Sequence, residues 1–279
     1  MRRVLLTILL VALITPARAE HRRDADFERV LVPVFFSGPG AFGAQWATTI
    51  ALMNTGPAID LAVPVVGERE TICPAVECLC NSEKRLPERN VETVCRENEH
   101  PSGMILYVPR RTERDDVHVG ARVLDTSRTN DRYGTAIPVV WERDLLDSPM
   151  VLLDIPTDRR YRTSLRLYDV FQWNTPFSVR FFDSAAARRG NATPLLETTV
   201  TAAWDPDPEN SQRFPMRPAF AFIGDIVAAY PQLAAVESVT IEIIGSHMPI
   251  SPPQPDRRFY ALASITNNRT QEITIVAPR

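Results

Sequence analysis

The chain has 279 residues, of which 31 are basic and 34 acidic, and its formal net charge is −3. Because charges of both signs are interspersed, the sequence lacks the strong basic bias of a nucleic-acid-binding surface, and we expect no nucleic-acid partner. The 24 prolines outnumber the 11 glycines. Proline disrupts helix interiors and is typical of loops and edge strands, so the composition favours an all-β protein with many short strands.

Residues 1–19, MRRVLLTILLVALITPARA, have the order of a signal peptide. Two arginines precede an apolar run at residues 4–14, which is too short to span a bilayer, and Ala17-Arg18-Ala19 forms an A-x-A cleavage site. No later run approaches the roughly 18 apolar residues of a membrane span. We therefore expect an extracytoplasmic protein, periplasmic or secreted, that begins at Glu20 and does not span a membrane.

A strand–turn–strand pattern near the start of the mature chain recurs in its second half. Residues 46–66, WATTIALMNTGPAIDLAVPVV, and residues 161–182, YRTSLRLYDVFQWNTPFSVRFF, both alternate apolar and polar side chains, break at a turn and alternate again. Alternation with period two is typical of a strand with one buried face. A third similarity links Ser127-Arg128-Thr129 to Asn268-Arg269-Thr270. The repeat predicts two related β-sandwich domains.

The phase of the alternation predicts which side chains enter the core. Counterparts in the two copies are expected to point inward, namely Ile50, Leu52, Leu165 and Leu167. Thr49 and Arg166 are out of phase with them and are expected to face solvent. The same alignment places Asn54 opposite Asp169 at the ends of the two strands.

The expected segments follow from changes in composition along the chain. In order, they are a signal peptide at 1–19, a flexible lead-in at 20–28, domain 1 at 29–147 with a Cys-bearing insertion at 67–101, and domain 2 at 148–279. The stretch from Trp141 to Met150 marks the boundary between the domains. Domain 2 carries the one expected helix, Gly224–Tyr230, which Asp225 caps and Pro231 ends.

All the cysteines, Cys73, Cys78, Cys80 and Cys95, lie in the insertion. Four thiols in an exported chain imply two disulfides, each worth roughly 2–4 kcal/mol. A Cys78–Cys80 bridge would close a strained ring, which leaves Cys73–Cys78 with Cys80–Cys95, or Cys73–Cys80 with Cys78–Cys95. A zinc site with His100 is the competing interpretation, but the cysteines lack the usual paired C-x2-C spacing.

Gly38, Gly40 and Gly43 follow an apolar strand and spell the G-x-G-x-x-G fingerprint of dinucleotide-binding proteins. That fingerprint needs a helix beginning near Gly43. The residues that follow, WATTIAL, instead have strand character. We therefore expect the glycines to permit positive φ angles in a surface loop, with no bound cofactor.

Acidic residues alternate at Asp205, Asp207 and Glu209, a spacing that can ligate Ca²⁺, but the glycine and distal glutamate of an EF-hand loop are absent. A solvated acidic loop is therefore expected there. No G-x-S-x-G, HExxH or P-loop motif occurs, and the histidines are scattered. We expect no catalytic residue, no cofactor and no metal site.

Two tryptophans are the candidate ligand contacts, Trp141 at the domain boundary and Trp173 in the turn VFQWNT. Exposed aromatic side chains on β-sandwich loops can stack on sugars or contact a protein partner. Packing of each ring in the core is the alternative.

Several segments together carry a resemblance to a known group: LVPVFF, GPGAFGAQW, TTIALMNTG, YGTAIPVV and YALASITNNRT. They resemble uncharacterised secreted bacterial proteins with immunoglobulin-like β-sandwich domains, over most of the mature chain. The resemblance implies an all-β fold of two tandem immunoglobulin-like β-sandwich domains and an extracytoplasmic location. It carries no catalytic residues.

These observations predict an exported, non-enzymatic β-sandwich protein that binds a protein or glycan partner at the cell envelope or outside the cell. One alternative is a carbohydrate-binding module or a degenerate glycan-active enzyme. The other is a structural component of the envelope.

Overall fold

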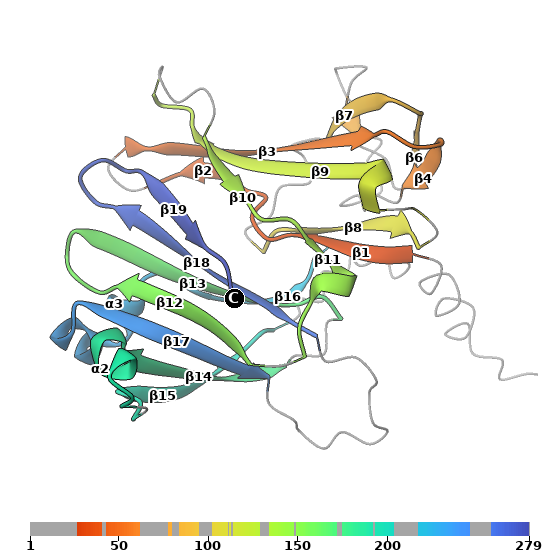
Figure 1. The fold of residues 1–279 in the computed structure, drawn as a ribbon. Coiled ribbons are helices and arrows are strands. Elements are labelled where there is room, and N and C mark those ends of the chain that lie inside the picture. Colours follow the sequence, from red (N-terminus) through yellow and green to blue (C-terminus); the bar gives the residue numbers. More distant parts are fainter. Residues whose placement is uncertain are drawn as a thin grey trace, which may run out of the picture.

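The computed structural model describes residues 27–40, 43–61, 78–79, 84–94, 102–110, 112, 114–128, 134–147, 149–171, 175–191, 193–203, 217–245 and 258–278. Within these ranges the chain forms mainly antiparallel β-sheets with two short α-helices, which confirms the expected all-β class (Figure 1). None of the helices in the described ranges is long and apolar enough to cross a membrane.

The first half of the chain contains β1 (Phe27–Val32), β2 (Ser37–Pro39), β3 (Gln45–Asn54), β4 (Ile59–Leu61), β5 (Cys78–Leu79), β6 (Lys84–Leu86), β7 (Asn90–Val94), β8 (Met104–Pro109), β9 (Val117–Asp125), β10 (Thr135–Ile137) and β11 (Val140–Trp141), with 3₁₀ turns η3 (Arg114–Asp116) and η4 (Glu142–Asp144). The middle sheet has the order β11-β1-β8. The large sheet has the order β10-β9-β3-β7-β5, with β2 also paired to β3, and β4 pairs with β6.

The second half contains β12 (Met150–Pro156), β13 (Tyr161–Asp169), β14 (Pro176–Asp183), α2 (Ser184–Arg188), β15 (Leu196–Thr201), β16 (Ala219–Ile223), α3 (Ile226–Ala229), η5 (Pro231–Ala235), β17 (Ser238–Gly245), β18 (Tyr260–Asn267) and β19 (Ile273–Val276). The outer sheet has the order β12-β17-β14-β15. The floor sheet has the order β16-β13-β18-β19.

The middle sheet is buried on both faces. Val30 and Val32 of β1 join the core formed with the large sheet. Leu31, between them, joins the core that fills the second half, together with Ile105 and Tyr107 of β8. Figure 1 accordingly shows the large, middle, floor and outer sheets as successive layers. The two halves therefore share apolar packing rather than meeting only at a linker.

The repeated strands β3 and β13 occupy equivalent positions in their sheets. Ile50 and Leu52 are as fully buried as their counterparts Leu165 and Leu167, which confirms the predicted phase. Each strand also ends in the same turn, because the side-chain oxygens of Asn54 and Asp169 accept a hydrogen bond from the backbone N–H two residues later, at 3.1 and 2.8 Å.

The similarity between residues 127–129 and 268–270 is present in the structure, but its alignment is displaced by one residue. Trp46 pairs with Asp125 in β9, and its counterpart Tyr161 pairs with Asn267 in β18. Asp125 and Asn267 each accept a hydrogen bond from the N–H two residues later. Ser127 therefore corresponds to Arg269, so the alignment of Ser127 with Asn268 is wrong by one position.

The ends of the expected segments differ from the structure in three places. Strand β1 begins at Phe27 and buries Glu28, so the lead-in is shorter than 20–28. The expected boundary at 141–150 is packed, since Leu145 is buried and Leu146 forms a β-bridge with Phe259. Helix α2, which Asp183 caps by accepting the N–H of Ala185, is a second helix where the sequence predicts only one, at Gly224–Tyr230.

The expected second-half helix is confirmed as α3. The Asp225 carboxylate accepts the N–H groups of Val227 and Ala228, and Pro231 begins the following turn η5. We expect Asp225→Ala to lower the free energy of unfolding by about 1 kcal/mol, because two helix N–H groups lose their acceptor. Denaturant melts measure the change, and Asp225→Asn, which keeps a capping oxygen, should retain most of the stability.

Candidate functional site

A pocket of about 360 Å³ lies where the large sheet and the floor sheet face each other beyond the end of the middle sheet. We call it the inter-half pocket, because both halves of the chain line it. Figure 1 labels strands that carry its lining, including β2, β3 and β10 in the first half of the chain and β13, β18 and β19 in the second. Its volume lies in the range of small-molecule sites in proteins.

The floor of the inter-half pocket is the polar face of β13 and β18. Arg162, Ser164 and Arg166 alternate along β13, so all three point to the same side of the sheet. Ser264 lies opposite Ser164 on β18, and the two hydroxyl oxygens are 2.5 Å apart. This row combines two guanidinium groups with a hydroxyl pair midway between them.

The guanidinium of Arg166 stacks on aromatic rings of β16. Its central carbon lies 4.6 Å from the ring centre of Phe222 and 5.6 Å from that of Phe220. Phe222 itself is 51% exposed and lies beside the mouth of the pocket. Contact with a ring face orients a guanidinium while its N–H donors remain directed in the plane of the group.

The walls of the inter-half pocket are apolar and are fixed to the backbone. Phe36 and Trp46 line one side, and Ile137 and Ile275 line the other. The Thr48 hydroxyl donates to the carbonyl of Phe36 and accepts its N–H, at 3.1 and 3.2 Å, which holds the segment after β1 against β3. The Thr135 hydroxyl donates to the carbonyl of Ile273 at 3.1 Å.

Beyond Arg166, the same face of the floor sheet is covered by the first half of the chain. Tyr168, the next residue on this face of β13, is fully buried and donates its hydroxyl hydrogen bond to the carbonyl of Pro33. Burial raises the pKa of the Tyr168 hydroxyl, so it remains a donor. This hydrogen bond ties the floor sheet to the segment after β1.

The glycine-rich segment contributes to the pocket wall and not to a nucleotide site. No helix follows Gly43; the next element is β3, as the strand character of WATTIAL predicted. Gly43 does adopt a positive φ of +81°. Gly40 serves packing, because a Cβ there would overlap the indole of Trp46. The helix that the dinucleotide fingerprint requires after Gly43 is therefore replaced by strand β3.

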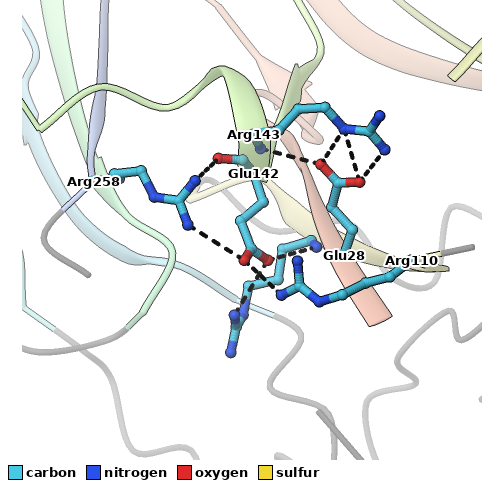
Figure 2. A network of polar contacts seen from close by, with 6 residues as sticks. Glu28, Arg110, Glu142, Arg143 and Arg258 are labelled. Carbon is cyan, nitrogen blue, oxygen red and sulfur yellow. Dashed lines mark hydrogen bonds and ion pairs between the residues drawn. The ribbon is translucent and has the colours of Figure 1, made fainter. Parts of the chain in front are cut away.

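A second set of polar residues, the Glu142 cluster, joins the halves on the other side of the middle sheet. Figure 2 shows the Glu142 carboxylate surrounded by arginines from three separate segments. It accepts the Arg29 N–H at 3.0 Å and the Arg110 guanidinium at 2.8 Å, and Arg258 lies 3.6 Å away. Arg258 also donates to the Glu142 carbonyl at 2.9 Å. Next to this group, Glu28 binds the backbone and side chain of Arg143.

The charge of Glu142 is stabilised although the side chain is only 3% exposed. Burial acts to raise the pKa of its carboxyl, but hydrogen bonds from Arg110 and from the Arg29 backbone, with the charges of both arginines, outweigh it and lower the pKa. Arg29 and Arg258 also lie over the Phe171 ring, at 4.8 and 5.8 Å from its centre. The Glu142 cluster is therefore a structural joint rather than an accessible site.

The residues expected to contact a ligand do not form the site. Trp141 is 5% exposed and packs in the core between the large and middle sheets, so its expected role as an exposed contact is wrong. It is buried because β11 pairs with β1 and turns the indole inward. Trp173 lies outside the described residues, as do Asp205, Asp207 and Glu209. Among the described residues, no cluster of three metal-ligating side chains occurs.

Cys73, Cys80, Cys95 and His100 also lie outside the described residues, and only the backbone of Cys78 is described, so the disulfides stay a prediction. Strands β5 and β7 are parallel, with Cys78 opposite Thr93 and Leu79 opposite Val94.

We expect non-reducing peptide mapping of the exported protein to recover two disulfides, either Cys73–Cys78 with Cys80–Cys95 or Cys73–Cys80 with Cys78–Cys95. Four free thiols that bind zinc would contradict both disulfide pairings.

The inter-half pocket is not apparent from the sequence, because alternation assigns Arg166 to solvent. Arg166 does lie on the face opposite Leu165 and Leu167, as the phase requires, yet it is half-buried in the pocket. The sequence feature that does indicate a covering layer is the continuous apolar run in the first strand. A strand with no polar face is buried on both sides. A sheet from the second half therefore has to cover one face of this strand.

Comparisons of the chain with protein-family models, curated proteins and solved structures find no match.

Proposed function

We propose that the protein is an exported, non-enzymatic binding protein whose ligand occupies the inter-half pocket. The observation that carries the proposal is the lining of that pocket, in which two arginines and a hydroxyl pair face Phe36 and Trp46 across a concave space. A few convergent polar groups in an apolar cavity are typical of ligand sites. Binding is favoured over catalysis because the described lining offers no carboxylate, imidazole or thiol to act as base or nucleophile.

The proposal includes the location and the fold type expected from the sequence. The order of basic residues, apolar run and A-x-A site supports export with cleavage after Ala19. The equivalent positions of β3 and β13 support two tandem immunoglobulin-like β-sandwich units. N-terminal sequencing of the exported protein should begin at Glu20, and a chain that keeps Met1 would contradict export.

The shape of the site narrows the expected partner. A pocket of about 360 Å³ admits a small molecule or one terminal group of a protein or glycan chain. It does not provide the extended area that a folded protein surface needs. A small molecule is therefore the first candidate ligand. The protein or glycan partner expected from the sequence is the second candidate, and only a terminal group of its chain would enter the pocket.

A fragment screen by ligand-observed NMR tests whether the inter-half pocket binds ligands. Ser264→Trp places an indole on the floor of the pocket and should abolish the signals of fragments that bind the wild-type protein. Thr199→Trp is the control, because Thr199 is exposed on the outer sheet and lies outside the lining. Circular dichroism confirms that both variants fold. Fragments that bind both variants equally, or a screen with no binders, would overturn the proposal.

A further inference from the structure

The inter-half pocket carries positive charge at Arg162. The described lining of the pocket contains no aspartate or glutamate. In the described part of the chain, no carboxylate pairs with Arg162. Guanidinium groups remain charged at any physiological pH. An anion that enters the pocket therefore meets a favourable potential, strengthened by the apolar walls around it.

The polar groups of the floor are mainly donors. A guanidinium has five N–H donors and no acceptor. Ser164 and Ser264 share one hydroxyl proton between them, so the second proton of the pair is left to donate elsewhere. The Thr48 and Thr135 hydroxyls already donate to the backbone. The site therefore suits a ligand group that only accepts hydrogen bonds, as a carboxylate does.

The position of the hydroxyl pair defines where such a group lies. Ser164 is two residues from Arg162 and two from Arg166 on one strand face, about 7 Å of strand length from each. The side chains of arginine are long enough to reach a group held above the serines. The rest of the ligand then extends toward the rings of Phe36 and Trp46 and the side chain of Ile275, which offer mainly apolar contact.

We infer that the inter-half pocket binds a small amphiphilic carboxylate. Its carboxylate lies at the Ser164–Ser264 pair between the two arginines, and its hydrocarbon body packs against Phe36 and Trp46. A neutral sugar fits less well, because its hydroxyls need acceptors as well as donors and the described side chains of the lining supply few acceptors. This inference rests on the proposed function, since it names the ligand class of the same pocket.

Calorimetric titration of the full mature chain with three probes tests the ligand class. Octanoate has both the charge and the apolar body, 1-octanol has only the body, and glucuronate has the charge on a hydroxyl-rich ring. Octanoate should bind about tenfold or more tighter than either of the others, because only it uses both surfaces of the pocket. Its affinity should fall as salt is raised.

Arg162→Gln should weaken octanoate binding by about tenfold or more and leave 1-octanol binding unchanged. Arg159→Gln is the matched control, because Arg159 is exposed in the turn before β13. Ser164→Ala provides a second variant that keeps both charges, and it should weaken octanoate binding if Arg162→Gln fails to fold.

The outcomes separate the inference from the proposed function. If 1-octanol binds as tightly as octanoate, or glucuronate binds more tightly, the ligand class is wrong while the pocket remains a binding site. If no probe binds but fragments still bind the wild-type protein and not Ser264→Trp, the amphiphilic carboxylate is overturned and the proposed function stands. Loss of fragment binding as well overturns both.

Discussion

Glu142→Gln is expected to lower the free energy of unfolding by about 3 kcal/mol at neutral pH. The substitution keeps the shape of the side chain, but it removes the charge that Arg29, Arg110 and Arg258 surround. It also replaces one of the two accepting oxygens by an NH2 group that only donates. Breaking a buried ion pair by removing one partner costs roughly 3–5 kcal/mol. We expect the low end, because the Arg110 side chain is 47% exposed and water stabilises part of its charge.

Denaturant melts at several pH values test this explanation specifically. The pKa of the Glu142 carboxyl is lowered in the folded protein from an ordinary value of 4.5. Its charge therefore stabilises the fold above pH 4.5, and this contribution is lost as the pH falls through the lowered folded-state value. The difference between wild type and Glu142→Gln should shrink in that acidic range.

Glu197→Gln is the control for a surface ion pair. Glu197 lies 3.2 Å from Arg180, with half of its side chain exposed, so its removal should leave the melt almost unchanged. If Glu142→Gln were equally mild, the Glu142 cluster would not be the joint between the halves.

Leu52→Ala and Leu167→Ala are each expected to lower the free energy of unfolding by roughly 2–5 kcal/mol, because each leaves a cavity in a packed core. Leu52 is 1% exposed and Leu167 is fully buried. Leu153→Ala removes the same atoms from a side chain that is 44% exposed, and it should stay within about 0.5 kcal/mol. Equal effects for Leu52, Leu167 and Leu153 would contradict the assigned strand phase.

The sequence predicts strand positions and phase well, because both depend on local alternation. Ile50 and Leu165 lie where period two places them, and Asp225 caps the helix that its position indicates. Helix α2 was not predicted. It is one short turn, SAAAR, that the Asp183 cap holds, and the sequence around it resembles a polar loop. Short elements of this kind depend on a single cap and give little periodic signal.

The candidate site was not predictable in the same way. Alternation assigns Arg166 to the face opposite the core, but it does not say whether that face meets water or another layer of protein. Trp141 shows the converse problem, because its place at an expected domain boundary made it a candidate for an exposed contact, whereas the ring is packed inside. Both depend on how sheets from distant parts of the chain stack, which is information that neither strand carries alone.

The middle sheet has a consequence for how the chain acquires its structure during synthesis. Its strands β1, β8 and β11 are all complete before residue 142, but one of its faces is covered only by residues made later. Until then Leu31, Ile105 and Tyr107 form an uncovered apolar surface on a nascent first half, of the kind that promotes aggregation and recruits chaperones. The first half is therefore not an autonomous folding unit, and a fragment ending near residue 147 should require a solubilising partner to be recovered.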